Sequence, residues 1–305
     1  MRILLTGATG QVGGALLDPL SERGTVLAPS RSELDLTKPS GIKTFLDGWR
    51  PELIINPAAY TAVDRAEDEP GLAFRVNAES PYEIAKWAAH HDVPLIHFST
   101  DYVFDGAGQS AWREESAAAP LSVYGRSKLA GEEAIRAAAA PSLTIRTSWV
   151  YASQGHNFLL TISRLATERT ELRIVNDQFG APSSARAIAA AVTKIVAGGL
   201  PAFRSRVRHC DTVNIACAGE TSWFGFAEAI VDALRRRNRD LMTKRVIPIS
   251  SEEYPTRAVR PRNSRLDLTR ARQIFWITMP SWQHALDAEL ADLGSGQLRE
   301  ARRAV

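Results

Sequence analysis

Short apolar runs alternate with longer amphipathic segments along the first half of the chain. The apolar runs are RILLTG (2–7), TVLAPS (25–30), LIINPAA (53–59), PLIHFST (94–100) and LTIRTSWVY (143–151). The segments between them include AFRVNAESPYEIAKWAAHH and SKLAGEEAIRAAAA, which have the character of amphipathic or alanine-rich helices. Strands that alternate with helices favour parallel pairing, so we expect an α/β fold with a doubly wound, Rossmann-type, mostly parallel sheet.

This alternation loosens after about residue 150, where loops rich in proline and arginine appear, such as YPTRAVRPRNSRL (254–266). A chain of 305 residues is long enough for two domains. We predict a dinucleotide-binding domain over residues 1–150, completed by about 183–217. Residues 151–182 and 218–305 are expected to form a smaller, mixed α/β substrate domain.

The first apolar run leads directly into GATGQVGG, where Gly7, Gly10 and Gly13 have the spacing G-x-x-G-x-x-G. Glycines at such a turn let the backbone approach a pyrophosphate, and the following helix offers the positive end of its dipole. The position after a strand and before a helix predicts dinucleotide binding. A purely structural glycine turn is the alternative.

The choice of cofactor depends on the end of the second strand, in APSRSELDLT. Ser30 and Arg31 occupy this place, and the first carboxylate after them is Glu33. An arginine there pairs with the 2′-phosphate of NADP, whereas a carboxylate accepts the ribose hydroxyl of NAD. We therefore expect NADPH, with NADH also possible. Arg31 is alternatively an exposed loop charge.

The segment VYGRSKLAGE places Tyr124 four residues before Lys128, on one face of a helix. The spacing also arises by chance in many helices, but here it follows a predicted strand that ends in Thr100. Carbonyl reduction needs such a set: Thr100 orients the ketone oxygen, Tyr124 protonates it, and Lys128 lowers the pKa of the tyrosine.

Composition excludes several other classes of protein. The 37 basic and 34 acidic residues give a net charge of +3, and the densest basic cluster, ALRRRNRD (233–240), is more simply a solvated helix end than a nucleic-acid site. The two cysteines, Cys210 and Cys217, suggest neither a disulfide framework nor a zinc site. With no signal peptide and no membrane-spanning apolar run, a cytoplasmic location is expected.

A wider set of motifs resembles one enzyme family. GATGQVGG, NPAAYTAVDRAEDEP, VNAES, FSTDYVFDG, VYGRSKLAGE, RTSWVY, NDQFGAP and RPRNSRL follow one another over residues 1 to about 270. This set is similar to the dTDP-4-dehydrorhamnose reductases of the extended short-chain dehydrogenase/reductase superfamily. The resemblance implies NAD(P)H-dependent reduction of the C4 ketone of dTDP-4-dehydro-β-L-rhamnose to dTDP-β-L-rhamnose, the last step of dTDP-L-rhamnose synthesis, with Thr100, Tyr124 and Lys128 as the catalytic trio.

The resemblance also implies ligand contacts. It places Gln11 and Val12 along the pyrophosphate of the cofactor, and Asp35 and Leu36 near its adenine. Ala59, Tyr60 and Thr61 lie beside the rest of the cofactor, and Lys128 binds the nicotinamide ribose. In the dTDP-4-keto-6-deoxy sugar, the resemblance places Asp101 and Trp149 at the hexose. From their own chemistry, the amides of Asn176 and Gln178 suit a thymine ring, and Arg260 and Arg262 suit the diphosphate. Both arginines are alternatively ordinary surface charges.

Several of these residues have simpler interpretations. Trp149 can be a core residue instead of an apolar wall for the hexose, and Asn77 can face solvent instead of supporting the active site. The acidic run from Asp64 to Glu69 is most simply a helix start, because carboxylates favour the positive end of the helix dipole. His97 is more simply a satisfied core histidine than a ligand.

Some members of this family are dimers bridged by a metal that glutamates hold, but Ala15 and Arg186 occupy those places here. Neither side chain replaces a carboxylate ligand of Mg²⁺, so we expect no metal and a monomer or a homodimer without a metal bridge. Two alternative functions stay open: a 4-ketoreductase for another dTDP-4-keto-6-deoxyhexose, and a non-catalytic, NADP-binding regulatory subunit.

Overall fold

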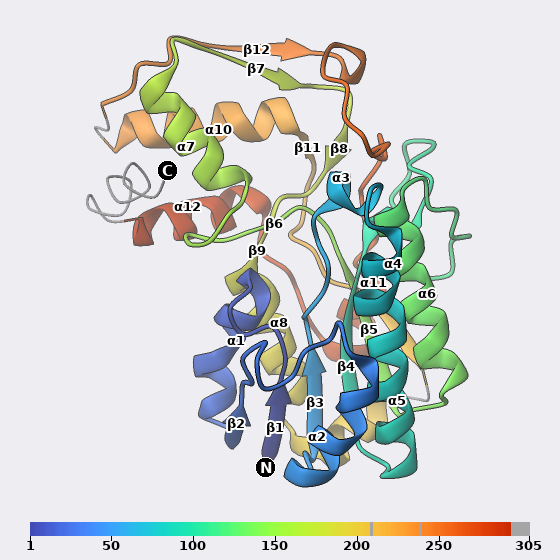
Figure 1. Ribbon diagram of the computed structural model, residues 1–305. Helices are drawn as coiled ribbons and strands as arrows, with labels where there is room; N and C mark the ends of the chain where they lie inside the picture. Colours follow the sequence, from blue (N-terminus) through green and yellow to red (C-terminus); the bar gives the residue numbers. More distant parts are fainter. Residues whose placement is uncertain (208–209, 238–239, 294–305) are drawn as a thin grey trace.

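A parallel sheet of six strands organises the lower part of the molecule in Figure 1. The computed structural model describes residues 1–207, 210–237 and 240–293. Its main sheet has the order β10-β5-β4-β3-β1-β2, and every neighbouring pair is parallel. The strands are β1 (Arg2–Leu5), β2 (Thr25–Leu27), β3 (Leu53–Asn56), β4 (Leu95–Thr100), β5 (Ser142–Thr147) and β10 (Asp211–Asn214). The predicted doubly wound fold is confirmed.

Helices cover both faces of this sheet. One face packs on α1 (Gln11–Ser21), α8 (Ala185–Val196), α9 (Gly199–Arg206) and α11 (Thr269–Phe275) through a large apolar core. The other face packs on α2 (Ile42–Trp49), α5 (Ser80–His90) and α6 (Val123–Ala137), where a second apolar cluster forms. Short segments join these elements: η1 (Pro39–Gly41), α3 (Val63–Ala66), α4 (Pro70–Phe74), the π-helical turn η2 (Arg75–Glu79) and η3 (Asp101–Val103).

The remaining elements form a second region of the molecule, which has its own apolar core. They comprise α7 (Phe158–Glu168), β7 (Glu171–Val175), α10 (Trp223–Arg236), β12 (Arg245–Ile249), η4 (Ser251–Glu253) and α12 (Trp282–Asp292). β7 pairs with β12 in parallel. Two very short pairs lie between the two cores: β6 (Val150–Tyr151) with β9 (Ser183–Ser184), and β8 (Phe179–Gly180) with β11 (Thr221–Ser222).

The division into two domains stays a prediction, and one segment departs from the proposed boundaries. Ala271 and Phe275 of α11 belong to the core of the six-stranded sheet, although they lie in the range assigned to the substrate domain. The chain therefore returns to the first region before α12 joins the second one. The last twelve residues of the proposed substrate domain, 294–305, lie outside the described residues.

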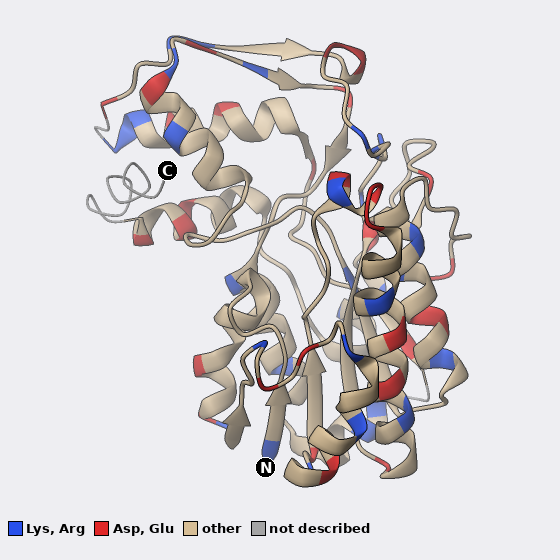
Figure 2. Ribbon diagram, in the orientation of Figure 1, with Lys and Arg blue, Asp and Glu red and all other residues tan. Residues whose placement is uncertain are grey.

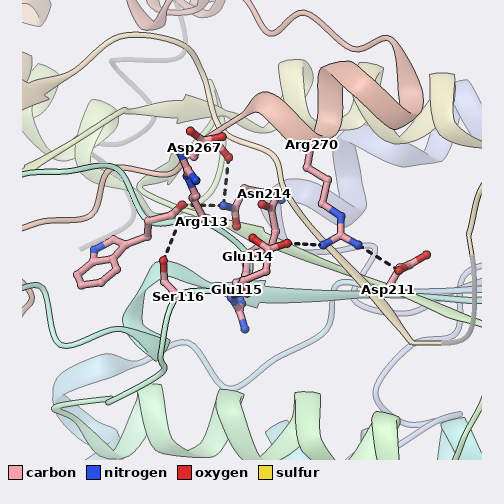
Figure 3. Close-up of polar contacts among 10 residues, drawn as sticks. Arg113, Glu114, Glu115, Ser116, Asp211, Asn214, Asp267 and Arg270 are labelled. Carbon is pink, nitrogen blue, oxygen red and sulfur yellow. Dashed lines mark hydrogen bonds and ion pairs between the residues drawn. The ribbon is translucent and has the colours of Figure 1, made fainter.

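The long loop between η3 and α6 is fixed to the far edge of the sheet (Figure 3). The backbone N–H of Asn214, on the edge strand β10, donates to Glu114 Oε1 at 2.8 Å. Arg270 of α11 bonds both Glu115 and Asp211, at 2.9 and 3.2 Å. These contacts hold the loop that leads into α6.

Basic and acidic residues are interspersed along the helices and loops, and neither kind is confined to one region (Figure 2). Of the predicted basic cluster at 233–240, residues 238 and 239 lie outside the described residues. Within the described residues no single helix is long and apolar enough to cross a membrane. The two helices Ala185–Val196 and Gly199–Arg206, which meet at an angle of 97°, are long and apolar enough only when they are taken together.

Candidate active site

The three predicted catalytic side chains lie where β4 ends and α6 begins. Thr100 is the last residue of β4, and its hydroxyl donates to Asp101 Oδ1 at 3.1 Å. Ser122 caps α6 by accepting from the N–H of Gly125, which fixes the first turn that carries Tyr124. Thr100 and Tyr124 share a side-chain hydrogen bond. The structure therefore brings these two hydroxyl groups together, with Lys128 one helical turn further on.

The expected effect of Lys128 on Tyr124 is wrong for this arrangement. Burial raises the pKa of Tyr124 to about 12; the hydrogen bond with Thr100 lowers it, and the charge of Asp101 adds to the rise. Lys128 is not among the groups that shift it, because its Nζ lies beside a ring nitrogen of His97, at 3.4 Å. Tyr124 is therefore protonated at neutral pH, which is the form that donates a proton to a ketone.

Lys128 itself is strongly affected by its surroundings. It is fully buried, and burial lowers its pKa to about 8, while the nearby charge of Glu132 opposes this shift. Both carboxylate oxygens of Glu132 are bound by Arg146 of β5, at 2.9 and 2.6 Å. Glu132 is therefore already neutralised by another cation, and Lys128 is left with a weakened charge partner.

Unpartnered polar atoms surround the ends of β4 and β5. In the described part of the chain, the buried side-chain oxygens Ser99 Oγ, Asp101 Oδ2, Thr147 Oγ1 and Ser148 Oγ have no hydrogen-bond partner. Burial raises the pKa of Asp101 to about 7. Because buried polar groups are nearly always hydrogen-bonded, this group of four indicates a place where a polar ligand supplies the missing bonds.

The glycine turn fits a dinucleotide. Gly7 has φ +60°, and a Cβ there would lie 2.8 Å from Ala58 Cα; at Gly13 a Cβ would lie 2.1 Å from Gly7 O. Gly10 precedes α1 without any side-chain cap, so the first N–H groups of the helix stay free for an anion. The side-chain oxygen of Gln11 is buried without a partner, and Val12 follows in the same turn.

The residues predicted to bind the adenosine part lie together after β2. The guanidinium of Arg31 is exposed, with 79% of its side chain accessible, and lies 3.8 Å from a carboxylate oxygen of Asp35. Ser30 is engaged by Glu33, which accepts from both its N–H and its hydroxyl at 2.8 Å. Leu36 is partly buried, and its carbonyl accepts from Ser80. A carboxylate thus lies beside Ser30, although Arg31 remains available.

Ala59, Tyr60 and Thr61 follow β3, and Asn77 of η2 fixes their backbone. The side chain of Asn77 accepts from Tyr60 N at 2.8 Å and donates to Tyr60 O at 3.0 Å. It also donates to Ser127, the neighbour of Lys128, at 2.9 Å. Asn77 is completely buried, so the solvent-facing interpretation is wrong. It connects the predicted cofactor loop to the helix that carries the catalytic residues.

Trp149 lies two residues after the end of β5 and has φ 49°, a left-handed conformation that a bulky residue seldom adopts. Its ring stacks on Trp223 of α10, with centroids 3.7 Å apart and an interplanar angle of 11°. Trp149 is only partly buried, so it is not an ordinary core residue. The two tryptophans together form an aromatic pair between the two regions.

The amide side chains predicted to bind thymine are engaged within the protein. Asn176 accepts from Ser222 at 2.6 Å, and Gln178 donates to Ser251 at 2.9 Å. Gln178 is buried, and the neighbouring Phe179 is covered by the guanidinium of Arg265, 4.9 Å from the ring centre. The structure therefore places these amides in the second region, on a different segment from Tyr124.

Arg260 does not stand free for a diphosphate. Its guanidinium forms a two-pronged ion pair with Asp64 of α3, at 2.7 and 3.2 Å. Arg262 is exposed, and its carbonyl accepts from Phe179 N. In the same loop Arg257 pairs with Asp68. The arginine loop is thus held against the first region by carboxylates.

The acidic run does more than begin a helix. Asp64 does lie in the first turn of α3, as expected. However, Glu67 accepts from the backbone N–H of Val123 at the start of α6, and Glu69 accepts from the hydroxyl of Tyr60 at 2.8 Å. This segment therefore connects the arginine loop, the start of α6 and the predicted cofactor loop.

The two positions discussed for a metal have other roles. Ala15 packs against the apolar core of the sheet, and Arg186 pairs with Glu289 and Asp292 of α12. Among the described residues, no group of three or more histidine, cysteine or acidic side chains is arranged to hold a metal ion. The expectation of no bridging metal stays a prediction.

Sequence reasoning missed several members of this site. The buried pair of Glu132 and Arg146 was not foreseen, although an arginine within the apolar run LTIRTSWVY was a usable signal. Trp223 lies too far along the chain to be associated with Trp149 from local pattern. His97 is a satisfied core histidine, as expected, but its contact with Lys128 was not anticipated.

A doubly wound sheet, a glycine turn shaped for a pyrophosphate, and a Thr–Tyr–Lys group at the carboxyl end of the strands together define a nicotinamide-dependent oxidoreductase of the extended short-chain dehydrogenase/reductase class. The family model described as "RmlD substrate binding domain" matches residues 1–295. The chain therefore belongs to the RmlD substrate binding domain family.

Named relatives cover nearly the whole chain. It is 39% identical over 297 residues to dTDP-4-dehydrorhamnose reductase of Escherichia coli K12, covering 96% of this chain and 98% of the relative. It is 41% identical over 300 residues to the Burkholderia thailandensis enzyme of the same name, covering 96% and 99%. The Bacillus anthracis dTDP-4-dehydrorhamnose reductase, solved in complex with NADP, is 32% identical with a TM-score of 0.86, covering 95% and 99%.

Proposed function

We propose that this chain reduces the C4 ketone of dTDP-4-dehydro-β-L-rhamnose to dTDP-β-L-rhamnose, using NADPH or NADH, as the last step of dTDP-L-rhamnose synthesis. The observation that carries this proposal is the protonated Tyr124, hydrogen-bonded to Thr100 at the carboxyl end of the sheet. It occurs in a chain that matches reductases of that name over 96% of its length.

The residues divide the reaction between them. When bound, the cofactor supplies a hydride to the C4 carbon of the sugar. Thr100 orients the ketone oxygen with its hydroxyl, and Tyr124 gives that oxygen its proton, so the ketone becomes an alcohol. Lys128 holds the nicotinamide ribose, and a pKa of about 8 lets it return a proton toward Tyr124 near neutral pH.

The substrate is bound by residues from both regions. The partly exposed Trp149, supported by Trp223, provides an apolar wall for the deoxyhexose, and Asp101 binds its hydroxyl groups. Asn176 and Gln178 contribute to the thymine subsite. Arg260 binds the diphosphate while it keeps its contact with Asp64, which limits how far the guanidinium moves.

The exposed Arg31 supports NADPH as the preferred cofactor, since a free guanidinium is suited to the 2′-phosphate. The NADP complex of the Bacillus anthracis relative supports the same choice. The carboxylate of Glu33 beside Ser30 favours the free ribose hydroxyls of NADH, so both cofactors are expected to support the reaction.

We further propose a monomer or a homodimer without a bridging metal, which binds neither nucleic acid nor membrane. Arg186 brings a positive charge to Glu289 and Asp292, which disfavours a cation there. Treatment with EDTA should leave both turnover and sedimentation unchanged. Halved activity, or conversion of a dimer to a monomer, would contradict this.

The identity of the sugar product tests the proposed function. The purified chain is incubated with NADPH and dTDP-4-dehydro-β-L-rhamnose, and the product is identified by NMR spectroscopy. We expect dTDP-β-L-rhamnose. The C4 epimer, or faster reduction of another dTDP-4-keto-6-deoxyhexose, would assign the chain to a related 4-ketoreductase. Tight NADPH binding without turnover of any of these sugars would identify a non-catalytic subunit.

A further inference from the structure

The side chain of Lys128 has an unusual partner. The residue is 1% exposed, and its Nζ lies 3.4 Å from Nε2 of His97 on β4. Glu132, one turn further along α6, is occupied on both oxygens by Arg146. In the part of the chain that the structure describes, His97 is therefore the one hydrogen-bond partner of Lys128 Nζ.

His97 continues into a row of buried polar side chains. Its other ring nitrogen, Nδ1, lies 3.1 Å from Asn56 Nδ2, and Asn56 Oδ1 accepts from the hydroxyl of Thr6 at 2.5 Å. Thr6, Asn56 and His97 are between 0 and 2% exposed. They come from the ends of the adjacent strands β1 and β3 and from β4. The row thus links Lys128 to the residue that precedes Gly7.

A histidine in this row has to be neutral, because burial and the charge of Lys128 hold its pKa well below the usual value. A neutral imidazole has one donor and one acceptor nitrogen. When Lys128 is an ammonium, Nε2 has to accept, so Nδ1 carries the hydrogen and needs the side-chain oxygen of Asn56. When Lys128 is an amine, Nε2–H donates to it and Nδ1 accepts from Asn56 Nδ2, the orientation seen here.

The row of Thr6, Asn56 and His97 can form hydrogen bonds with Lys128 in both its ammonium and its amine state. Turning over the amide of Asn56 exchanges its oxygen and nitrogen, and the hydroxyl of Thr6 can donate to the first or accept from the second. Lys128 and His97 therefore each have a hydrogen-bond partner in either state, which matters because an unpaired polar group in such an interior is costly. A leucine or valine at position 97 would offer neither arrangement.

We propose that His97 is a positioning residue for the reduction: through Asn56 and Thr6 it fixes the Lys128 nitrogen and offers hydrogen bonds to both its ammonium and its amine form. This inference rests on the proposed function, since it assigns His97 to the same site. His97 acts through Lys128 and does not touch the substrate.

Few other charges act on Lys128. Tyr124 and Glu132 lie on its own helix, Arg146 on β5 neutralises Glu132, and Asp101 lies on η3. The remaining charged groups on elements packed against α6 are exposed or paired elsewhere: Arg75 and Glu79 on η2, Glu83 and Lys86 on α5, and Asp64 and Arg65 on α3. A change at His97 should therefore be felt mainly by Lys128.

The test compares three variants with the parent chain. His97→Leu removes both ring nitrogens, whereas His97→Gln keeps an amide that can accept from Lys128. Thr144→Val is the matched control, because Thr144 is the buried register partner of His97 on β5 and has no bond to Lys128. Turnover and KM are measured across pH with NADPH and dTDP-4-dehydro-β-L-rhamnose.

We expect His97→Leu to lower kcat on the order of tenfold to a hundredfold, with KM changed less than threefold, because displacing a catalytic group is costly. The alkaline limb of its pH profile should move to lower pH, since an ammonium without an acceptor loses its proton more easily. His97→Gln should recover most of the parental kcat and most of the parental pH profile, and Thr144→Val should match the parent in both.

Parental turnover and pH profile in His97→Leu would overturn the proposal, as would equal losses in Thr144→Val. If His97→Leu does not fold, the comparison of His97→Gln with Thr144→Val decides between the two roles. A lower kcat in both variants, with the alkaline limb of the pH profile unshifted, would point to a structural role only. If the parent chain reduces no dTDP-sugar, the proposed function has failed. An NMR titration of Lys128 in the parent and in His97→Leu then tests the contact separately, and identical titration curves in the two chains would overturn it.

Discussion

The two faces of the central sheet are built for different purposes, and β4 shows the contrast within a few residues. Ile96 and Phe98 point into the apolar core against α1 and α8. His97 alternates with them and faces α6, where it meets Lys128. On the neighbouring strand Ile145 and Arg146 divide in the same way. Strand alternation thus separates a wholly apolar face at this end of the strands from a face where buried charges lie beside the second apolar cluster.

The polar face is costly for stability. A buried Arg–Glu pair loses its hydration, and replacement by apolar residues often leaves a protein equally stable or more stable. The same environment shifts the pKa values of Tyr124 and Lys128 in opposite directions, toward a protonated phenol and a readily exchanged lysine proton. The comparison teaches that the buried charges on this face are maintained for chemistry, whereas the apolar clusters on both faces supply the stability.

The largest effect should come from Tyr124→Phe, which removes the proton donor and leaves the packing in place. A general acid contributes about 10² to 10⁴ in rate, so turnover should fall at least a hundredfold. Binding of NADPH and the unfolding midpoint should stay close to those of the parent. Steady-state kinetics with a fluorescence titration of NADPH checks this, and turnover within threefold of the parent would remove Tyr124 from the proposed role.

The variants Glu132→Gln and Ile145→Val compare how much one residue on each face contributes to the free energy of unfolding. Breaking a buried ion pair from one side costs about 3–5 kcal/mol, because Arg146 keeps an uncompensated charge. Removing one methylene from the apolar face costs about 0.5–1.5 kcal/mol. Urea unfolding of both variants gives the free energies. Equal losses would mean that the pair is more exposed to water than the structure indicates.

Asp101 gives a pH-dependent contrast. Its pKa is raised from 3.8 to about 7 by burial, so between these values the folded chain keeps a proton that the unfolded chain releases. The contribution of Asp101 to the free energy of unfolding therefore falls as pH rises from about 4 to 7. Over this range the free energy of unfolding of Asp101→Asn should rise relative to that of the parent. The rise should be a few kcal/mol at most, because one pKa unit corresponds to about 1.4 kcal/mol. A constant difference in urea unfolding between pH 4.5 and 8 would argue against a buried carboxyl.

The smallest and most selective effect should come from Arg31→Ala, far from both faces on the exposed loop after β2. A charged hydrogen bond to a 2′-phosphate is worth tenfold or more in affinity. KM for NADPH should rise by about that factor, and KM for NADH should hardly change. A similar rise with both cofactors would mean that Arg31 lies outside the cofactor site.

The sequence predicted the fold well, because the sheet depends on local signals. The apolar runs identified five of the six strands of the central sheet but not the edge strand β10, and the position of Gly7 after the first run identified the cofactor turn. The meeting of Thr100 with Tyr124 followed from the rule that ligands bind at the carboxyl ends of parallel strands. These predictions needed no knowledge of distant contacts.

The rest depended on partners that local pattern does not reveal. The pairing of Arg260 with Asp64 joins residues 196 positions apart in the sequence, so Arg260 looked like a free cation. Lys128 looked like the partner of Tyr124 because both share a helix face, but burial turned its Nζ toward His97. Burial, which a single sequence shows poorly, decided the sign of the Tyr124 shift.

The most direct test of the account is the titration of Lys128 in the folded chain. Lysine labelled with ¹³C at Cε is incorporated, and Lys128→Met identifies the signal. We predict a midpoint near 8, below the usual 10.5 because of burial. Between these values the unfolded chain binds more protons, so the stability contributed by Lys128 should rise as pH rises from about 8 to 10.5. A midpoint at or above 10.5 would contradict the claim that the polar face of the sheet tunes this residue for catalysis.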